Sequence, residues 1–130
     1  MLDSLLPTQE VPRRGLRVAV TSETGRLVDA HFGRADVFMI FEVDSTGNRL
    51  VERRVVEELE DEEGVAVRIG RLVELIADCD AVVTSRVGPH AQELLDARGI
   101  LGVQYALAIE KGLTLALHEW QERNPGKPIQ

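Results

Sequence analysis

LRVAVTSETGRLVDAHFGRADVFMIFEV, residues 16–43, contains two apolar runs separated by a polar loop. The first run, Leu16–Thr21, is short, apolar and rich in β-branched residues, which is typical of a strand buried on both faces of a sheet. The second run, Val37–Val43, is almost continuously apolar and predicts another strand. The loop between them carries His31 in a glycine-bearing turn, after a strand end where open α/β sheets usually bind ligands.

A third run, Arg49–Val56, follows a turn signal at residues 44–48. It mixes apolar residues with charged ones such as Glu52 and Arg53, and charges inside a strand are typical of a sheet edge. We therefore expect the second and third runs to form an antiparallel hairpin with the charged strand outermost. The acidic stretch 57–63 is expected to be a solvated approach to the next helix rather than a metal cluster.

The second half of the chain alternates helix and strand. Apolar residues recur at Val65, Ile69, Leu72 and Ile76, which is one face of a helix. The following segments predict a strand, a short helix stopped by Gly99, a strand and a last helix, over residues 81–84, 89–97, 100–105 and 109–123. The buried stripe of the last helix is predicted to contain Ile109, Gly112, Leu113, Ala116, Leu117 and Trp120.

Helices between the later strands imply parallel pairing through right-handed crossovers. The pattern therefore predicts an α/β fold with a five-stranded mixed sheet of order 3-2-1-4-5. The second strand runs antiparallel, and helices cover both faces. This is the arrangement of a ribonuclease H-like motif, in which the loops after the first and fourth strands lie side by side at one end.

Length and charge limit the classes of function. The 130 residues predict one domain over 16–124, with a flexible N-terminal tail at 1–15 and a C-terminal tail at 125–130. The net charge of -7 argues against nucleic-acid and anionic-membrane partners, which attract clustered Lys and Arg. No apolar stretch approaches the roughly 20 residues that cross a bilayer, and the N-terminus lacks a secretory signal. We therefore expect a cytoplasmic protein.

The residues able to hold a metal or an anion fall in the two loops that are expected to meet. A neutral imidazole binds borderline metals through one nitrogen, and its other nitrogen usually needs a partner, for which Asp29 and Asp36 are near in the sequence. Guanidinium groups and a helix N-terminus both attract anions. The candidate cofactor-binding residues facing one shared crevice are therefore His31, Gly33, Arg34, Arg86, Gly88 and His90.

Each candidate also has an ordinary structural interpretation. The His31 side chain can simply stabilise its loop, a proline before His90 is common at a helix start, and both arginines can form surface ion pairs. Cys79 is the single cysteine, which excludes an intramolecular disulfide and a cage of several thiolates. It is expected to be buried, with a thiol pKa raised by adjacent aspartates. His118 is expected to face solvent.

Three stretches together resemble the dinitrogenase iron-molybdenum cofactor biosynthesis family, which includes NifX, the C-terminal domain of NifB and the core domain of NafY. They are RVAVTSETGRLVDAHFGRADVFMIFEVD at 17–44, DCDAVVTSRVGPHAQELLDARGI at 78–100, and the closing amphipathic helix. The resemblance covers roughly residues 16–120, and its VDxHFGRAD loop combined with the later GPHAQELL segment is more specific than either part alone.

The resemblance implies a domain that binds, carries or shields an iron–sulfur or iron–molybdenum type cofactor, or its precursor, as a transient cargo. It implies His31 as the best metal contact, with Cys79 and His90 as weaker candidates. The implied partners are the donor and acceptor proteins of nitrogenase-type metallocluster assembly. The domain is then not an enzyme.

Two other functions are compatible with such a fold. One is a regulatory or protein-interaction domain that carries no cluster. The other is a metal-dependent nuclease of the ribonuclease H-like type, which places an acidic residue within the first strand. That strand reads Arg17-Val18-Ala19-Val20-Thr21 and offers no carboxylate to hold magnesium, which argues against nuclease activity.

Overall fold

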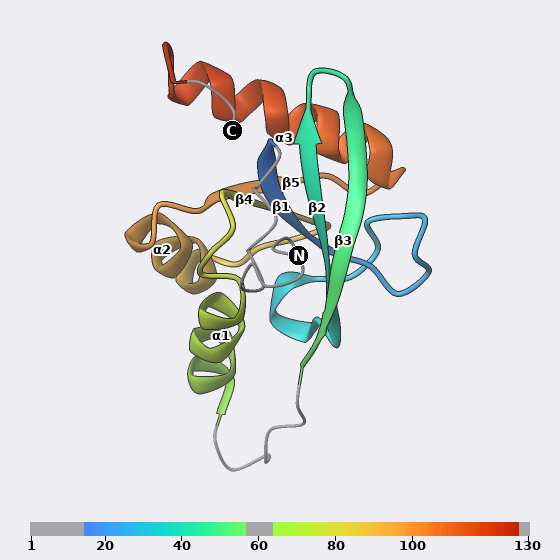
Figure 1. Ribbon diagram of the computed structural model, residues 1–130. Coiled ribbons are helices and arrows are strands. Elements are labelled where there is room, and N and C mark those ends of the chain that lie inside the picture. The colour runs from blue at the N-terminus through green and yellow to red at the C-terminus, as the bar shows by residue number, and fades with distance from the viewer. Residues whose placement is uncertain (1–14, 57–63, 128–130) are drawn as a thin grey trace, which may run out of the picture.

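The computed structural model describes residues 15–56 and 64–127 (Figure 1). The alternation of apolar runs and turn signals produces a sheet with helices packed on it. The elements in chain order are β1 Leu16–Thr21, the 3-10 turn η2 Phe32–Arg34, β2 Val37–Asp44, β3 Gly47–Val55, α1 Gly64–Leu75, β4 Ala81–Thr84, α2 Pro89–Ala97, β5 Leu101–Gln104 and α3 Ile109–Arg123.

The sheet has the predicted order, β3-β2-β1-β4-β5. β2 is antiparallel to both of its neighbours, whereas β4 is parallel to β1 and to β5. In register, Val18 lies opposite Ala81 and Val20 opposite Val83, so β1 and β4 end at the same edge of the sheet. The α/β fold class, the hairpin and the outermost position of the charged strand are confirmed. The ribonuclease H-like name stays a prediction.

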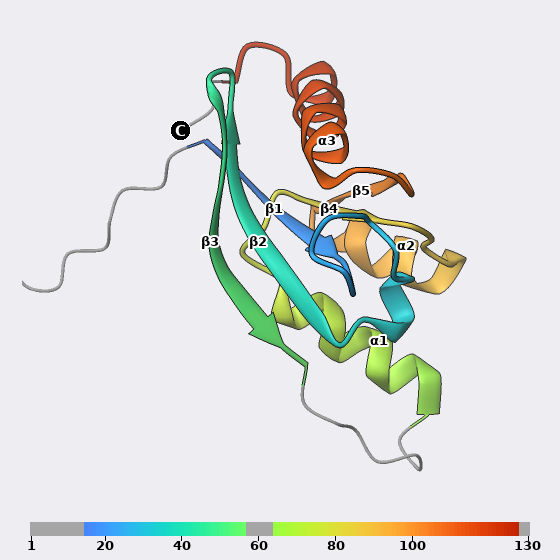
Figure 2. The ribbon, with the colours of Figure 1, turned by 90° about the vertical axis from the view of Figure 1, so that its right-hand side faces the viewer.

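Helices cover both faces of the sheet, as expected (Figure 2). On one face, Val18 and Val20 of β1 pack in a buried cluster with α3, which includes Leu113. On the other face, Ala19 packs in a second cluster with α1 and α2, which includes Leu72. This alternation follows the two-residue period of a strand. It buries β1 on both sides and confirms its central position.

Some details differ from the sequence-based expectation. β3 begins at Gly47 rather than Arg49, because the Asp44 carboxylate accepts the Thr46 N–H at 2.8 Å and closes a tight hairpin turn. Val65 is 72% exposed, since the buried residues of α1 begin only at Ile69.

Trp120, which was predicted to belong to the buried stripe of α3, is only partly buried and lies at the margin of the core. Gly99, at a φ of 69°, follows the C-cap of α2 and ends that helix as predicted. The acidic stretch 57–63 and most of both predicted tails, residues 1–14 and 128–130, lie outside the described residues. No helix within the described part of the chain is long and apolar enough to cross a membrane.

Candidate functional site

The two central strands end in the same tripeptide, Val-Thr-Ser, at residues 20–22 and 83–85. Thr21 and Thr84 are fully buried, and their hydroxyl oxygens lie 2.9 Å apart. Both hydroxyls also contact the carbonyl oxygen of Ala30, at 2.7 and 3.1 Å. The paired threonines therefore fasten the middle of the long β1–β2 loop to the ends of two strands. This contact between Thr21 and Thr84 was not predicted from the sequence, although the repeated Val-Thr-Ser tripeptide could have indicated it.

The loops after β1 and β4 lie side by side, as predicted. His31 and Arg86 form an isolated parallel β-bridge. The Phe32 N–H donates to the Arg86 carbonyl at 2.9 Å, and the Ser85 N–H donates to the Ala30 carbonyl at 3.2 Å. Backbone hydrogen bonds across the two loops therefore hold His31 next to Arg86, although 54 residues lie between them in the chain.

Packing below the loop explains how His31 is presented. Phe32 is fully buried, with its ring centroid 5.8 Å from that of Phe38. The Arg68 side chain of α1 donates from Nε to the Gly33 carbonyl at 2.9 Å and from Nη2 to the Ala35 carbonyl at 3.0 Å. The η2 turn is thus held from inside and from α1. Arg68 is a second residue that sequence reasoning missed, since only tertiary contact reveals it.

The candidate polar side chains in these loops are exposed, namely His31, Arg34, Arg86 and His90. Within residues 15–56 and 64–127, neither of the two arginines takes part in an ion pair. Gly88 is the N-cap of α2, and no side-chain hydrogen bond caps this helix start. Helix N-termini carry partial positive charge, so this surface combines that charge with two guanidinium groups that form no ion pair within the described residues. The exposed Asp29 and Asp36 lie in the same loop as Arg34, so this surface presents charges of both signs on a chain of net charge -7.

The His31 imidazole has no hydrogen-bond partner within the described ranges, although two aspartates are close in sequence. Asp29 instead accepts the N–H of Glu23 at 2.7 Å and stabilises its own loop. Both ring nitrogens of His31 therefore remain available to an external ligand. Among the described residues, no group of three or more His, Cys, Asp or Glu side chains converges on a metal position. Within the described residues, a metal held by His31 would therefore have at most one further His, Cys, Asp or Glu ligand.

Cys79 does not share this surface. It lies before β4, whereas Arg86 follows β4, so the two are at opposite ends of the same strand. The cysteine is 6% exposed, which confirms the predicted burial, and its sulfur lies 3.8 Å from an Asp78 carboxylate oxygen. His118 is exposed on α3, as expected. The structure therefore brings the two predicted loops together and leaves Cys79 apart.

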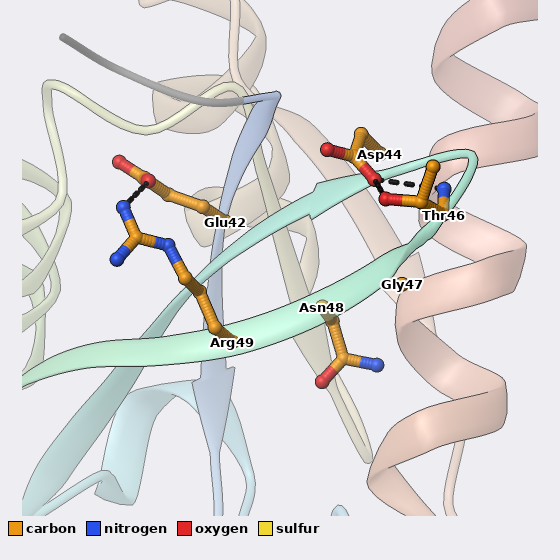
Figure 3. Close-up of a pocket in the computed structure, with 6 residues that line it drawn as sticks. All are labelled: Glu42, Asp44, Thr46, Gly47, Asn48 and Arg49. Carbon is orange, nitrogen blue, oxygen red and sulfur yellow. Dashed lines mark hydrogen bonds and ion pairs between the residues drawn. The ribbon is translucent and has the colours of Figure 1, made fainter.

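A hollow of about 220 Å³ lies at the tip of the β2–β3 hairpin (Figure 3). Its acidic residues already have partners: Glu42 pairs with Arg49 at 2.7 Å and with Arg17 at 3.1 Å. The Asp44 carboxylate accepts the Thr46 N–H. Because β1 starts beside this tip and ends beside His31, the hollow is at the opposite end of the sheet from the paired loops.

Comparisons with known proteins agree with the fold and the motifs. The dinitrogenase iron-molybdenum cofactor family matches residues 14–122. The chain is 32% identical over 106 residues to the FeMo cofactor biosynthesis protein NifB of Frankia alni, covering 78% of this chain and 21% of that protein. It is 36% identical over 87 residues to Protein NifX of Rhodobacter capsulatus, covering 63% of this chain and 55% of that protein.

A solved structure supports the fold independently. The apo form of the orange protein from Desulfovibrio gigas superposes with a TM-score of 0.52 at 19% identity, covering 92% of this chain and 96% of that one. The chain spans about a fifth of the length of the NifB relative and about half of the NifX relative. The family match covers most of the sequence, including both paired loops. The chain therefore belongs to the dinitrogenase iron-molybdenum cofactor family.

Proposed function

We propose that this protein binds and carries an iron–sulfur or iron–molybdenum type cofactor, or its precursor, during metallocluster assembly. The cargo sits on the surface of the two paired loops. His31 supplies a metal ligand, and Arg34, Arg86 and the start of α2 attract the anionic cluster. His90, beside that helix start, is a secondary contact. The main support for this proposal is the β-bridge between His31 and Arg86, because it brings the VDxHFGRAD loop and the loop before GPHAQELL together on one exposed surface.

A single histidine suits a carrier better than a complete thiolate cage does. Each additional metal–ligand bond must break before the cargo passes to an acceptor, so few protein ligands favour transfer. Electrostatic attraction from exposed arginines adds affinity while leaving the cluster accessible. In this proposal the protein acts without catalysis, and its partners are the proteins that deliver and receive the cluster.

The test is an anaerobic titration of the apo-protein with isolated iron–molybdenum cofactor and with a synthetic iron–sulfur cubane, followed by optical and EPR spectroscopy. His31→Ala should bind about tenfold or more weakly, because the metal loses its protein ligand. His118→Ala is the matched control, since that histidine is also exposed but lies on α3. Circular dichroism should show the same fold in all three proteins.

The outcomes separate the assignments. Equal binding by His31→Ala and wild type would refute the role of His31. A wild-type protein that binds neither probe would refute the carrier function. Specific capture of an assembly protein by such a cluster-free chain would instead support the regulatory alternative.

A further inference from the structure

Most of the eleven glycines are required by the fold. A backbone φ that L side chains rarely adopt occurs at Gly15, Gly25, Gly47, Gly64, Gly99 and Gly126. An added Cβ at Gly112 would lie 2.9 Å from the buried Val83, and one at Gly102 would lie 2.9 Å from the amide end of Gln92, a flexible side chain that can move aside. Neither reason applies to the remaining glycines, which are Gly33, Gly70 and Gly88.

There is free space at these remaining positions. An added Cβ at Gly33 would meet only Ile69, at 3.9 Å, which is an ordinary van der Waals contact. At Gly70 and Gly88 it would meet nothing within 4 Å. Gly88 has a φ of -79° and a ψ of 169°, an extended conformation open to every residue. A serine or aspartate would also cap α2 better than glycine does.

Two of these three glycines flank the candidate site. Gly33 follows His31 by two residues, and Gly88 follows Arg86 by two residues. These are the two positions joined by the β-bridge. The third, Gly70, lies within α1. Glycine thus occurs on both loops of the site where folding alone would favour a larger residue.

We infer that Gly33 and Gly88 keep the backbone on both sides of the His31–Arg86 bridge clear for a bulky ligand. This inference rests on the proposed carrier function and adds a determinant of size and shape to it. Without a Cβ, the main chain can approach a cluster closely, as glycine loops approach phosphates. A side chain at Gly88 would stand at the exposed start of α2, and one at Gly33 would fill the space between the loop and Ile69 of α1, so either would add bulk beside the bridge.

The test compares Gly33→Ala and Gly88→Ser with Gly70→Ala as the matched control. Thermal unfolding of the apo-proteins should show melting temperatures equal to wild type or higher by about 2–5 °C, since the larger residues restrict the unfolded chain or cap the helix. Anaerobic titration with isolated iron–molybdenum cofactor and the iron–sulfur cubane should show about tenfold weaker binding for the two site variants. Gly70→Ala should bind like wild type.

A fall of more than about 5 °C in the melting temperature of either site variant would show that the fold needs that glycine, and would overturn the inference whatever the cargo. Wild-type affinity in both site variants would overturn it and leave the carrier function standing. If wild type itself binds neither probe, the carrier function and this inference both fail.

Discussion

Charged side chains form ion pairs where β1 begins but not among the described residues where β1 ends. Where β1 begins, Arg17 pairs with Glu42 at 3.1 Å and with Asp78 at 2.8 Å, and Arg54 also donates to Asp78 at 2.9 Å. Where β1 ends, the guanidinium of Arg86 forms no ion pair within residues 15–56 and 64–127. We call the first region the paired end and the second the open end.

This difference separates stability from binding. At the paired end Glu42 is only 6% exposed, so its charge must be matched inside the protein. At the open end the backbone, the buried Phe32 and the Arg68 side chain hold the loop, whereas the exposed Arg34 and Arg86 form no ion pair within the described residues. Substitutions at the paired end, and of Arg68 beneath the open-end loop, should therefore change stability, whereas substitutions of the exposed Arg34 and Arg86 should change ligand binding.

The largest effect is expected for Glu42→Ala. The substitution leaves the partly buried Arg17 without one of its carboxylate partners, and should lower the free energy of unfolding by about 3 kcal/mol. Urea unfolding followed by circular dichroism measures this loss. Glu52→Ala is the control, because Glu52 is an exposed carboxylate of the same network. If both variants lost the same free energy of unfolding, the burial of Glu42 would not explain its contribution to stability.

Arg68→Ala should have the next largest effect. It removes two hydrogen bonds to the Gly33 and Ala35 carbonyls, which should cost about 1–2 kcal/mol of stability. Hydrogen exchange should accelerate in residues 31–36 more than in β4. Arg68→Lys should restore the charge but not the forked geometry, so it should rescue only part of the loss. Uniform acceleration over the whole chain would contradict a local role.

Acid should weaken the paired end through Asp78. Hydrogen bonding from Arg54, together with Arg17, holds the pKa of the Asp78 carboxyl below its ordinary value. The carboxylate is therefore fully stabilising above the unfolded-state pKa of about 4, and this contribution is lost as pH falls toward the lower folded-state value. Because the Asp78 side chain is half-exposed, we expect this loss of charge to lower the free energy of unfolding by only about 1 kcal/mol.

Asp78→Asn supplies the comparison for this pH effect. Thermal unfolding from pH 6 down to about pH 2 should show a smaller decrease in the variant than in wild type. Parallel pH profiles of the two proteins would contradict the assignment.

The smallest effect on stability is expected at the open end. Arg34→Gln and Arg86→Gln should each change the free energy of unfolding by less than about 0.5 kcal/mol, because both side chains are exposed. Binding of the iron–sulfur cubane should nevertheless weaken and become less sensitive to added salt. A loss of stability comparable with that of Glu42→Ala would contradict the contrast between the two ends.

Local patterns in the sequence predicted most of the fold. The short β-branched run at Leu16–Thr21 predicted a central strand because a strand covered on both faces has no polar side. The charges in Arg49–Val56 predicted an edge strand, because an edge strand exposes side chains to solvent. Val65 shows where this reasoning failed, since helical spacing does not reveal where the partner surface ends.

The candidate site was only partly predictable. The position of His31 after a central strand indicated a ligand-binding loop, and the expected strand order placed it beside the loop of Arg86. The contribution of Arg68 was not visible, because an arginine on a helix has many possible partners. The expected use of Asp29 as a partner of His31 is not seen among the described residues; one Asp29 carboxylate oxygen accepts the Glu23 N–H.

By itself, the sequence determined the strands, the helices, their order in the sheet and the loops in which chemistry was to be expected. Hydrophobic periodicity records which side of each segment is buried, and that information is local. The tertiary structure alone decided that Thr21 meets Thr84, that Arg17 and Arg54 share Asp78, and that Gly33 lies beside Ile69. These contacts join residues far apart in the chain, so they exist only once the sheet has formed.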